Sequence, residues 1–273
     1  MTPGQVIEAD DDSPADPFEL ALARARGLPD APGRTPWAAY ETQTVGVPCA
    51  WLVPAHLEAG MNDVRLSDPA DLQIPEDQSR ALLTACAPLL TEDGIALRYV
   101  RPGAWLAQGE MLEGLTCWSP RRAAGRSLLP GQLLRADDPA RQGKLLRLVS
   151  ELQMLLHAHP VNDGRERAGL PAINALWLYG AGRLEQLAAP EPDVSVATDL
   201  IAEDRNGVQA WQGLDEGPVA QLLAHAQDGG SVRLTLCGPR RARTWVAAPG
   251  ASWWAVARRL LRPVSIAAAL EGL

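Results

Sequence analysis

The chain has 273 residues, 47% of them hydrophobic, so it can bury a core without metals or disulfides. The formal net charge is −8, and residues 1–100 hold 16 acidic against 6 basic side chains, which disfavours general binding to nucleic-acid phosphates. No run approaches the roughly 18 apolar residues that cross a bilayer, and the acidic N-terminus does not resemble a signal peptide, so we expect a cytoplasmic protein.

The first 35 residues mix acidic side chains with proline and glycine, a composition typical of a flexible arm. A short amphipathic helix over Phe18–Arg26 is compatible with that arm. We expect an N-terminal subdomain over residues 36–135 and a C-terminal subdomain over residues 136–273, which could also form one continuous globule. Alternating strand and helix signals predict an α/β or α+β fold, with a mixed β-sheet flanked by helices.

The first strand signal is the apolar run Val45–Val53, which ends at Pro54. His56 follows directly, either as a general base or as a histidine bonded to the backbone. A second strand is predicted over Asp63–Leu66. A helix should begin near Pro75 and present apolar residues at helical spacing.

A hairpin should follow that helix, with strands over Ile95–Val100 and Ala104–Ala107. Residues 116–131 should form a loop or short helix. Its arginines either bind an anion or are solvated; they are Arg121, Arg122 and Arg126.

Asp138 is a good helix start, and this second helix should end at His157 or His159, before Pro160. Gln153 and His157 share one flank of its apolar face. A polar loop over residues 161–171 should then lead into a strand and the glycine turn at residues 180–182. A dinucleotide fingerprint would need a third glycine where Glu185 stands, so we predict no cofactor.

The C-terminal part offers residues 194–206 as strand or helix, a helix over Gly217–Ala226, a strand pair over Ser231–Cys237 and Arg243–Ala247, and a helix over Ala251–Leu261. Arginines and tryptophans are concentrated in this part. Either the tryptophans belong to the core and the arginines surround them at the surface, or both form a surface that binds single-stranded nucleic acid. They are Arg240, Arg241, Arg243, Trp245, Trp253, Trp254, Arg258, Arg259 and Arg262.

The four cysteines lie far apart, without the spacing of a zinc site, so we predict no metal site and expect four buried thiols. They are Cys49, Cys86, Cys117 and Cys237.

The stretch ELQMLLHAHPVNDGRERAGLP, followed by INALWLYGAGR, resembles the RpfE-type bacterial regulatory proteins, a group described as phosphoglycerate mutase-like. The similarity runs from about Pro48 to Cys237 and includes PAHLEAG and LTLCG. INALWLYGAGRLEQL more distantly resembles the archaeal-type cofactor-independent phosphoglycerate mutases of the alkaline phosphatase superfamily. This resemblance implies a remnant of that fold, and a reaction that needs two divalent metals held by Asp and His clusters.

The chain has only four histidines, no N-terminal Asp-Gly metal motif after a first strand and no Asp-His pair, which the resemblance implies for this reaction. We therefore expect a non-catalytic regulatory or small-anion-binding protein on this scaffold. The alternative is a metal-dependent phosphoglycerate mutase or phosphatase, with His157 or His56 as acid/base and Arg165 as phosphate clamp. A second alternative is a protein or nucleic-acid interaction module that uses the C-terminal arginines and tryptophans.

The candidate site lies within residues 151–183, where the arginine suits an anionic or phosphorylated ligand and the asparagines suit hydroxyl groups. The same residues could instead tie the loop after the second helix to the sheet. A protein partner is the other expectation, and oligomeric state is not readable. The site residues are Gln153, His157, Asn162, Arg165, Asn174, Trp177, Gly180 and Gly182.

Overall fold

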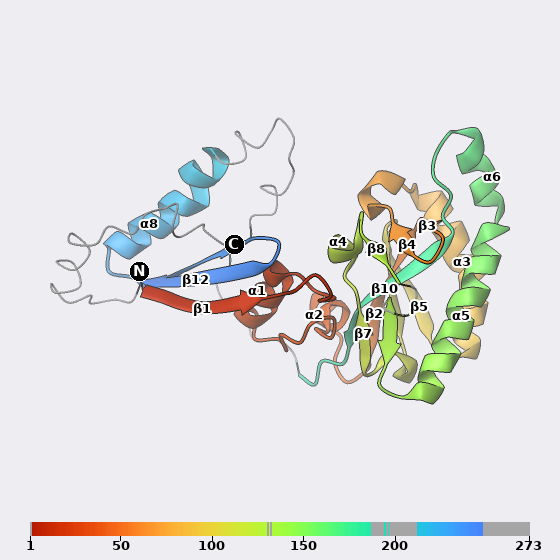
Figure 1. The fold of residues 1–273 in the computed structure, drawn as a ribbon, viewed down its shortest axis with the longest axis horizontal. Helices are drawn as coiled ribbons and strands as arrows, with labels where there is room; N and C mark the ends of the chain where they lie inside the picture. The colour runs from red at the N-terminus through yellow and green to blue at the C-terminus, as the bar shows by residue number, and fades with distance from the viewer. Residues whose placement is uncertain are drawn as a thin grey trace. The chain divides into compact units, whose positions relative to one another are not determined.

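The computed structural model describes residues 2–129, 131, 133–186, 194, 196 and 212–247 (Figure 1). The chain divides into two compact units. The central unit comprises Asp12–Asp16 and Arg26–Pro190, and the terminal unit comprises Met1–Asp11, Pro17–Ala25 and Glu191–Leu273. The sequence predicted boundaries at residues 35 and 135. In the division by compactness, residues 1–11 and 17–25 belong to the terminal unit, and residues 12–16 belong to the central unit.

A four-stranded sheet forms the centre of the central unit, in the order β10-β2-β6-β5. All of its ladders are antiparallel, and β5 and β6 form a hairpin. Side chains alternate between two buried faces, which accounts for the nearly continuous apolar sequence of β2 and β6. The strands are β2 (Cys49–Ala55), β5 (Ala96–Arg101), β6 (Ala104–Gln108) and β10 (Ala175–Gly182).

Two long helices, α3 (Glu76–Glu92) and α5 (Pro139–His157), pack together and against one face of this sheet (Figure 1). Leucines at helical spacing line the buried side of α5, and Asp138 caps its first turn by accepting from the backbone N–H of Ala140 at 3.0 Å. Ser79 of α3 donates to the carbonyl oxygen of Pro102 at 2.7 Å, which ties the helix to the hairpin turn.

The opposite face of the sheet carries the short helix α2 (Trp37–Glu41), which packs on β10 and β2. A second apolar cluster on this side includes Trp177, Trp118 and Leu66. The smaller elements of the unit are β3 (Leu57–Ala59), β4 (Val64–Leu66), η1 (Pro69–Leu72), η2 (Glu110–Leu112), β7 (Leu115–Cys117), α4 (Pro120–Ala123), β8 (Ser127–Leu128), β9 (Leu134–Ala136) and α6 (Pro160–Arg167).

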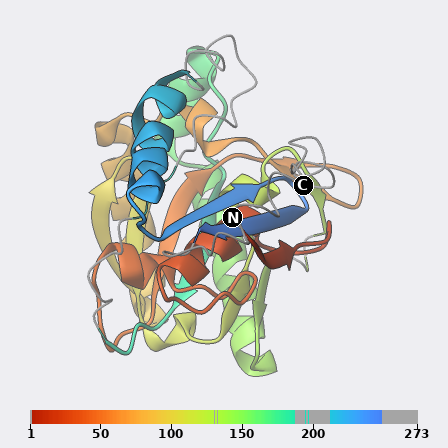
Figure 2. The ribbon, with the colours of Figure 1, turned by 90° about the vertical axis from the view of Figure 1, so that its left-hand side faces the viewer.

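The terminal unit contains the antiparallel sheet β1-β12-β11, whose red and blue strands lie side by side in Figure 2. Its elements are β1 (Thr2–Glu8), α1 (Pro17–Ala25), η5 (Asp215–Val219), α8 (Ala220–Gln227), β11 (Val232–Cys237) and β12 (Arg241–Ala247). Residues 2–8 and 17–25, which the sequence placed in an arm, thus form a strand and a helix.

The expected combination of sheets and flanking helices is confirmed, as are both long helices, the hairpin and the strand pair near the C-terminus. Every ladder among the described strands is antiparallel, and one isolated bridge, Leu66 with Ala124, is parallel. No helix in this part of the chain has the length and apolarity needed to cross a membrane. The helix predicted over residues 251–261 and the strand or helix predicted over 194–206 lie outside the described residues, apart from 194 and 196.

Two local predictions were wrong. Residues 160–167 form helix α6 instead of a polar loop, because His159 accepts from the backbone N–H of Val161 and Pro160 occupies the first helical position. The glycines at 180 and 182 belong to strand β10 instead of a turn, and the register of β10 against β2 shifts between Tyr179 and Gly182. A β-bulge therefore replaces the expected turn.

Gly180→Ala should destabilise the protein by about 1–3 kcal/mol more than Gly125→Ala, as measured by urea denaturation. Both glycines have positive φ, at +63° and +71°. A Cβ at 180 would lie 2.9 Å from the Cβ of Trp37, whereas a Cβ at 125 meets no atom within 4 Å. Equal losses would show that α2 does not pack this closely on β10.

Candidate functional site

Four consecutive residues, 171–174, are held by side chains that the sequence singled out, and we call this segment the clamped loop. Arg165 donates through Nε to the carbonyl oxygen of Pro171 at 2.7 Å. Asn162 of the same helix, α6, bonds both backbone groups of Ile173, donating at 2.9 Å and accepting at 2.7 Å. Helix α6 thus fixes two of the four residues.

The other two residues of the clamped loop are bonded by His56, which lies between β2 and β3, and by Leu57, the first residue of β3. His56 Nδ1 lies 2.7 Å from the carbonyl oxygen of Ala172, which can only accept, so this nitrogen carries the proton. The side chain of Asn174 accepts from the N–H of Leu57 at 2.8 Å and donates to its carbonyl oxygen at 2.9 Å, as a β-bridge would.

Arg165 is fully buried, and its three hydrogen-bond acceptors within the described residues are uncharged. Besides Pro171 it donates to the carbonyl oxygen of Leu72 at 2.6 Å and to the side chain of Gln78 at 3.0 Å. Burial lowers the pKa of Arg165 from its usual range. The guanidinium therefore joins α6, η1 and the start of α3, and these contacts account for its position without a ligand.

The remaining predicted site residues lie apart from the clamped loop. Trp177 is buried and donates through Nε1 to the carbonyl oxygen of Trp118 at 2.8 Å, and Gly180 and Gly182 bring β10 close to residues 36–38. Gln153 is half-buried and His157 is exposed on α5. Neither side chain forms a hydrogen bond within the described residues.

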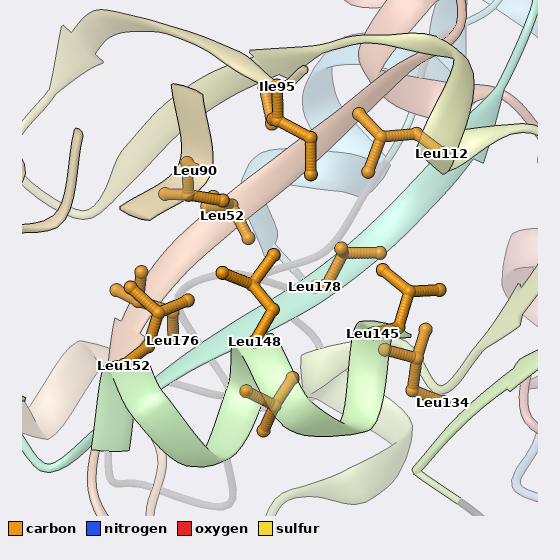
Figure 3. A pocket seen from close by; sticks show the side chains of 12 residues that line it. Leu52, Leu90, Ile95, Leu112, Leu134, Leu145, Leu148, Leu152, Leu176 and Leu178 are labelled. Carbon is orange, nitrogen blue, oxygen red and sulfur yellow. The ribbon is translucent and has the colours of Figure 1, made fainter. Parts of the chain in front are cut away.

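A small void of about 20 Å³ lies between the sheet and the two long helices. In Figure 3 leucines of α5 (Leu145, Leu148 and Leu152) point toward leucines of β10 (Leu176 and Leu178) around it. Its lining is entirely apolar, so it has no groups that would orient a polar ligand. The void is a packing defect of the core.

Two arginines of the segment 116–131 bond to other parts of the protein, and three of the cysteines are buried. Arg121 forms an ion pair with Asp16 at 2.9 Å, and the buried Arg122 donates to the carbonyl oxygen of Ser13 at 3.3 Å. Burial raises the pKa of the Cys86 thiol to about 12 and that of Cys117 above its usual value. Cys49 is buried too, whereas the prediction of burial was wrong for Cys237, which is exposed on the last residue of β11.

The ligand chemistry of a two-metal phosphotransferase does not fit these surroundings. In the described parts of the chain no group of three or more His, Cys, Asp and Glu side chains could hold a metal ion. His56 and His159 each use Nδ1 in a bond to the backbone.

A different polar group, on the sheet face opposite α3 and α5, was not foreseen. Glu41, the last residue of α2, accepts through Oε2 from Nε1 of the buried Trp51 at 2.9 Å. The guanidinium of Arg101 lies over the same indole, 5.4 Å from its ring centroid. Desolvation raises the pKa of the Glu41 carboxyl, and the bond from Trp51 and the charge of Arg101 oppose this rise.

Arg98 lies on the same face as Trp51, because it pairs with Leu106 of β6, which in turn pairs with Trp51 of β2. Strict alternation would place Arg101 on the other face. A register shift between Tyr99 and Arg101 turns it toward Trp51. We call Glu41, Arg98 and Arg101 the β5 polar group. No sequence pattern predicts this group, because it depends on the bulge in β5 and on the contact between α2 and the sheet.

Arg165→Met should lower the free energy of unfolding by about 2–4 kcal/mol, because the carbonyl oxygens of Pro171 and Leu72 lose their donor and the one at Leu72 is buried. The matched control is Arg167→Met on the same helix. That side chain is exposed, and within the described residues it bonds only to the carbonyl oxygen of Asp163, so its loss should cost less than about 0.5 kcal/mol. Similar values for the two variants in urea denaturation would contradict the structural role of Arg165.

Glu41→Gln should make stability less dependent on pH. A carboxyl whose pKa is raised by folding contributes stability below its unfolded pKa, and this contribution is lost as pH rises through the folded pKa. The variant should therefore gain on the wild type as pH rises from about 4.5, until Glu41 is ionised in both states. Denaturation curves between pH 4 and pH 8 measure the difference, and a constant offset would refute it.

No protein-family model and no curated protein matches this chain. Among solved structures it is similar to a cofactor-independent phosphoglycerate mutase from Thermoplasma acidophilum DSM 1728, with 15% identity and a TM-score of 0.40 over 84% of this chain and 76% of that one. It is also similar to the PH0037 protein from Pyrococcus horikoshii, with 14% identity and a TM-score of 0.42 over 91% and 75%. Because both TM-scores are below 0.5, neither similarity supports a conclusion about reaction or ligand.

Proposed function

We propose that this chain is a non-catalytic, small-anion-binding regulatory protein, and that the β5 polar group binds the anion. The observation that carries the proposal is the state of Arg98. Its side chain is exposed, and it has neither a hydrogen bond nor an ion pair within the part of the chain that the structure describes.

Several other arginines of the central unit are already paired with carboxylates. Arg34 forms an ion pair with Asp137, and Arg183 forms ion pairs with Glu110 and Glu113. A free anion would have to displace these carboxylates, whereas it can approach Arg98 without breaking any bond. The charge of Arg98 is therefore available.

The second cation of the group has its position restrained. Arg101 contacts the ring of Trp51, which is only 1% exposed, while Glu41 holds the indole nitrogen. With Glu41 ionised, the three charges of the group sum to +1. Two guanidiniums on one strand can bind a carboxylate or phosphate through forked donors, and part of the ordering is done before the ligand arrives.

Inorganic phosphate and phosphorylated three-carbon acids should raise the thermal midpoint of the wild-type protein at constant ionic strength, because a ligand of the folded state stabilises it. Arg98→Gln should remove most of the shift. Arg135→Gln should keep it, since Arg135 is exposed on β9 and belongs to a different sheet. No shift with any of these anions, or an unchanged shift in Arg98→Gln, would refute the proposal.

A further inference from the structure

The strand that carries Arg98, β5, lies at one end of the strand order of its sheet. In the sheet order β10-β2-β6-β5, strand β5 pairs with β6 on one side and with no other described strand. Alternate residues of an edge strand turn their N–H and C=O groups outward, which makes it a template for another extended chain. Three of its first five side chains are exposed: Ala96, Arg98 and Val100.

We infer that the anion bound here is a carboxylate carried by an extended acidic segment of a partner protein, which adds to β5 as a fifth strand. This inference deepens the proposed function, because it names the source of the anion. Residues 96–99 keep a regular register with β6, and the irregularity begins after Tyr99. The segment that can accept a new strand is therefore Ala96–Tyr99.

The charge of the edge selects the partner. Strand β5 carries Arg98 and Arg101 and no acidic residue. A residue opposite Arg98 on an added strand would have its Cβ about 5 Å away on the same face, a spacing at which opposite charges attract and like charges repel. Glutamate or aspartate at that position is favoured.

The same charges disfavour a second copy of this chain. Two β5 strands paired edge to edge would bring the arginines of both copies together, and the bulge would shorten the common ladder. Two acidic residues at the ends of α3, which packs on β5, already form ion pairs, Glu76 with Arg80 and Asp93 with Arg147. The charges on β5 therefore repel the same strand of a second copy and attract an acidic strand.

The test uses the peptide acetyl-Thr-Glu-Val-Glu-Thr-amide, labelled with a fluorophore, and the full-length protein. Binding is followed by fluorescence anisotropy at low salt. We expect binding that weakens at least fivefold in Arg98→Gln and is unchanged in the control Arg135→Gln. Replacing both glutamates of the peptide by glutamine should weaken it similarly.

A peptide with N-methylated backbone amides separates strand addition from simple charge attraction. It keeps both carboxylates but cannot donate to β5, so its binding should fall at least tenfold. Equal binding of the two peptides, or no binding of either, would overturn the inference. Phosphate is measured in parallel: if phosphate binds and the peptide does not, the anion site stands and only the inference fails, whereas failure of both removes the proposed function too.

Sedimentation of the unliganded protein tests whether a second copy of this chain binds at β5 instead. The inference predicts no self-association that the peptide reverses. A dimer that dissociates when the peptide is added would show that a second copy occupies β5, and would overturn the choice of an acidic partner.

Discussion

The clamped loop at residues 171–174 is the constraint on which the arrangement of the central unit depends. Four side chains reach it or reach out from it, and together they join β10 to α6, to η1 and to the connection between β2 and β3. Because the bonds between Asn162 and Ile173 are buried, losing the Asn162 side chain leaves backbone groups that water cannot satisfy. The position of β10, and with it the approach of α2 to the sheet, follows from these bonds.

Sequence reasoning was accurate where one local signal determines the structure. Asp138 and Pro139 begin α5, and the turn at Pro102 and Gly103 separates β5 from β6. It was less accurate where a residue has two possible uses. His159 was predicted as a possible last residue of α5, but it caps the start of α6, a helix that was predicted as a loop.

The predicted site residues show the same ambiguity more strongly. Asparagine and arginine beside a histidine suit a ligand, and they equally suit backbone groups that a loop leaves unpaired. The sequence does not indicate which kind of partner these side chains bond. The backbone partners Leu72 and Leu57 lie about a hundred residues from Arg165 and Asn174. The β5 polar group was missed for a related reason: alternation along β5 places Arg98 and Arg101 on opposite faces, and only the bulge reunites them.

The clamped loop also has a consequence for how the chain folds during synthesis. The bond between His56 and Ala172 spans 116 residues. At roughly 5 to 20 residues per second, about 6 to 23 s pass between the synthesis of these two residues. Throughout that interval β2 is made but lacks both its β10 neighbour and the clamp, whereas the β5–β6 hairpin is complete once Gln108 has been made. The early half of the sheet therefore remains with an unpaired edge on β2, at the stage when a nascent chain is most exposed to wrong pairing.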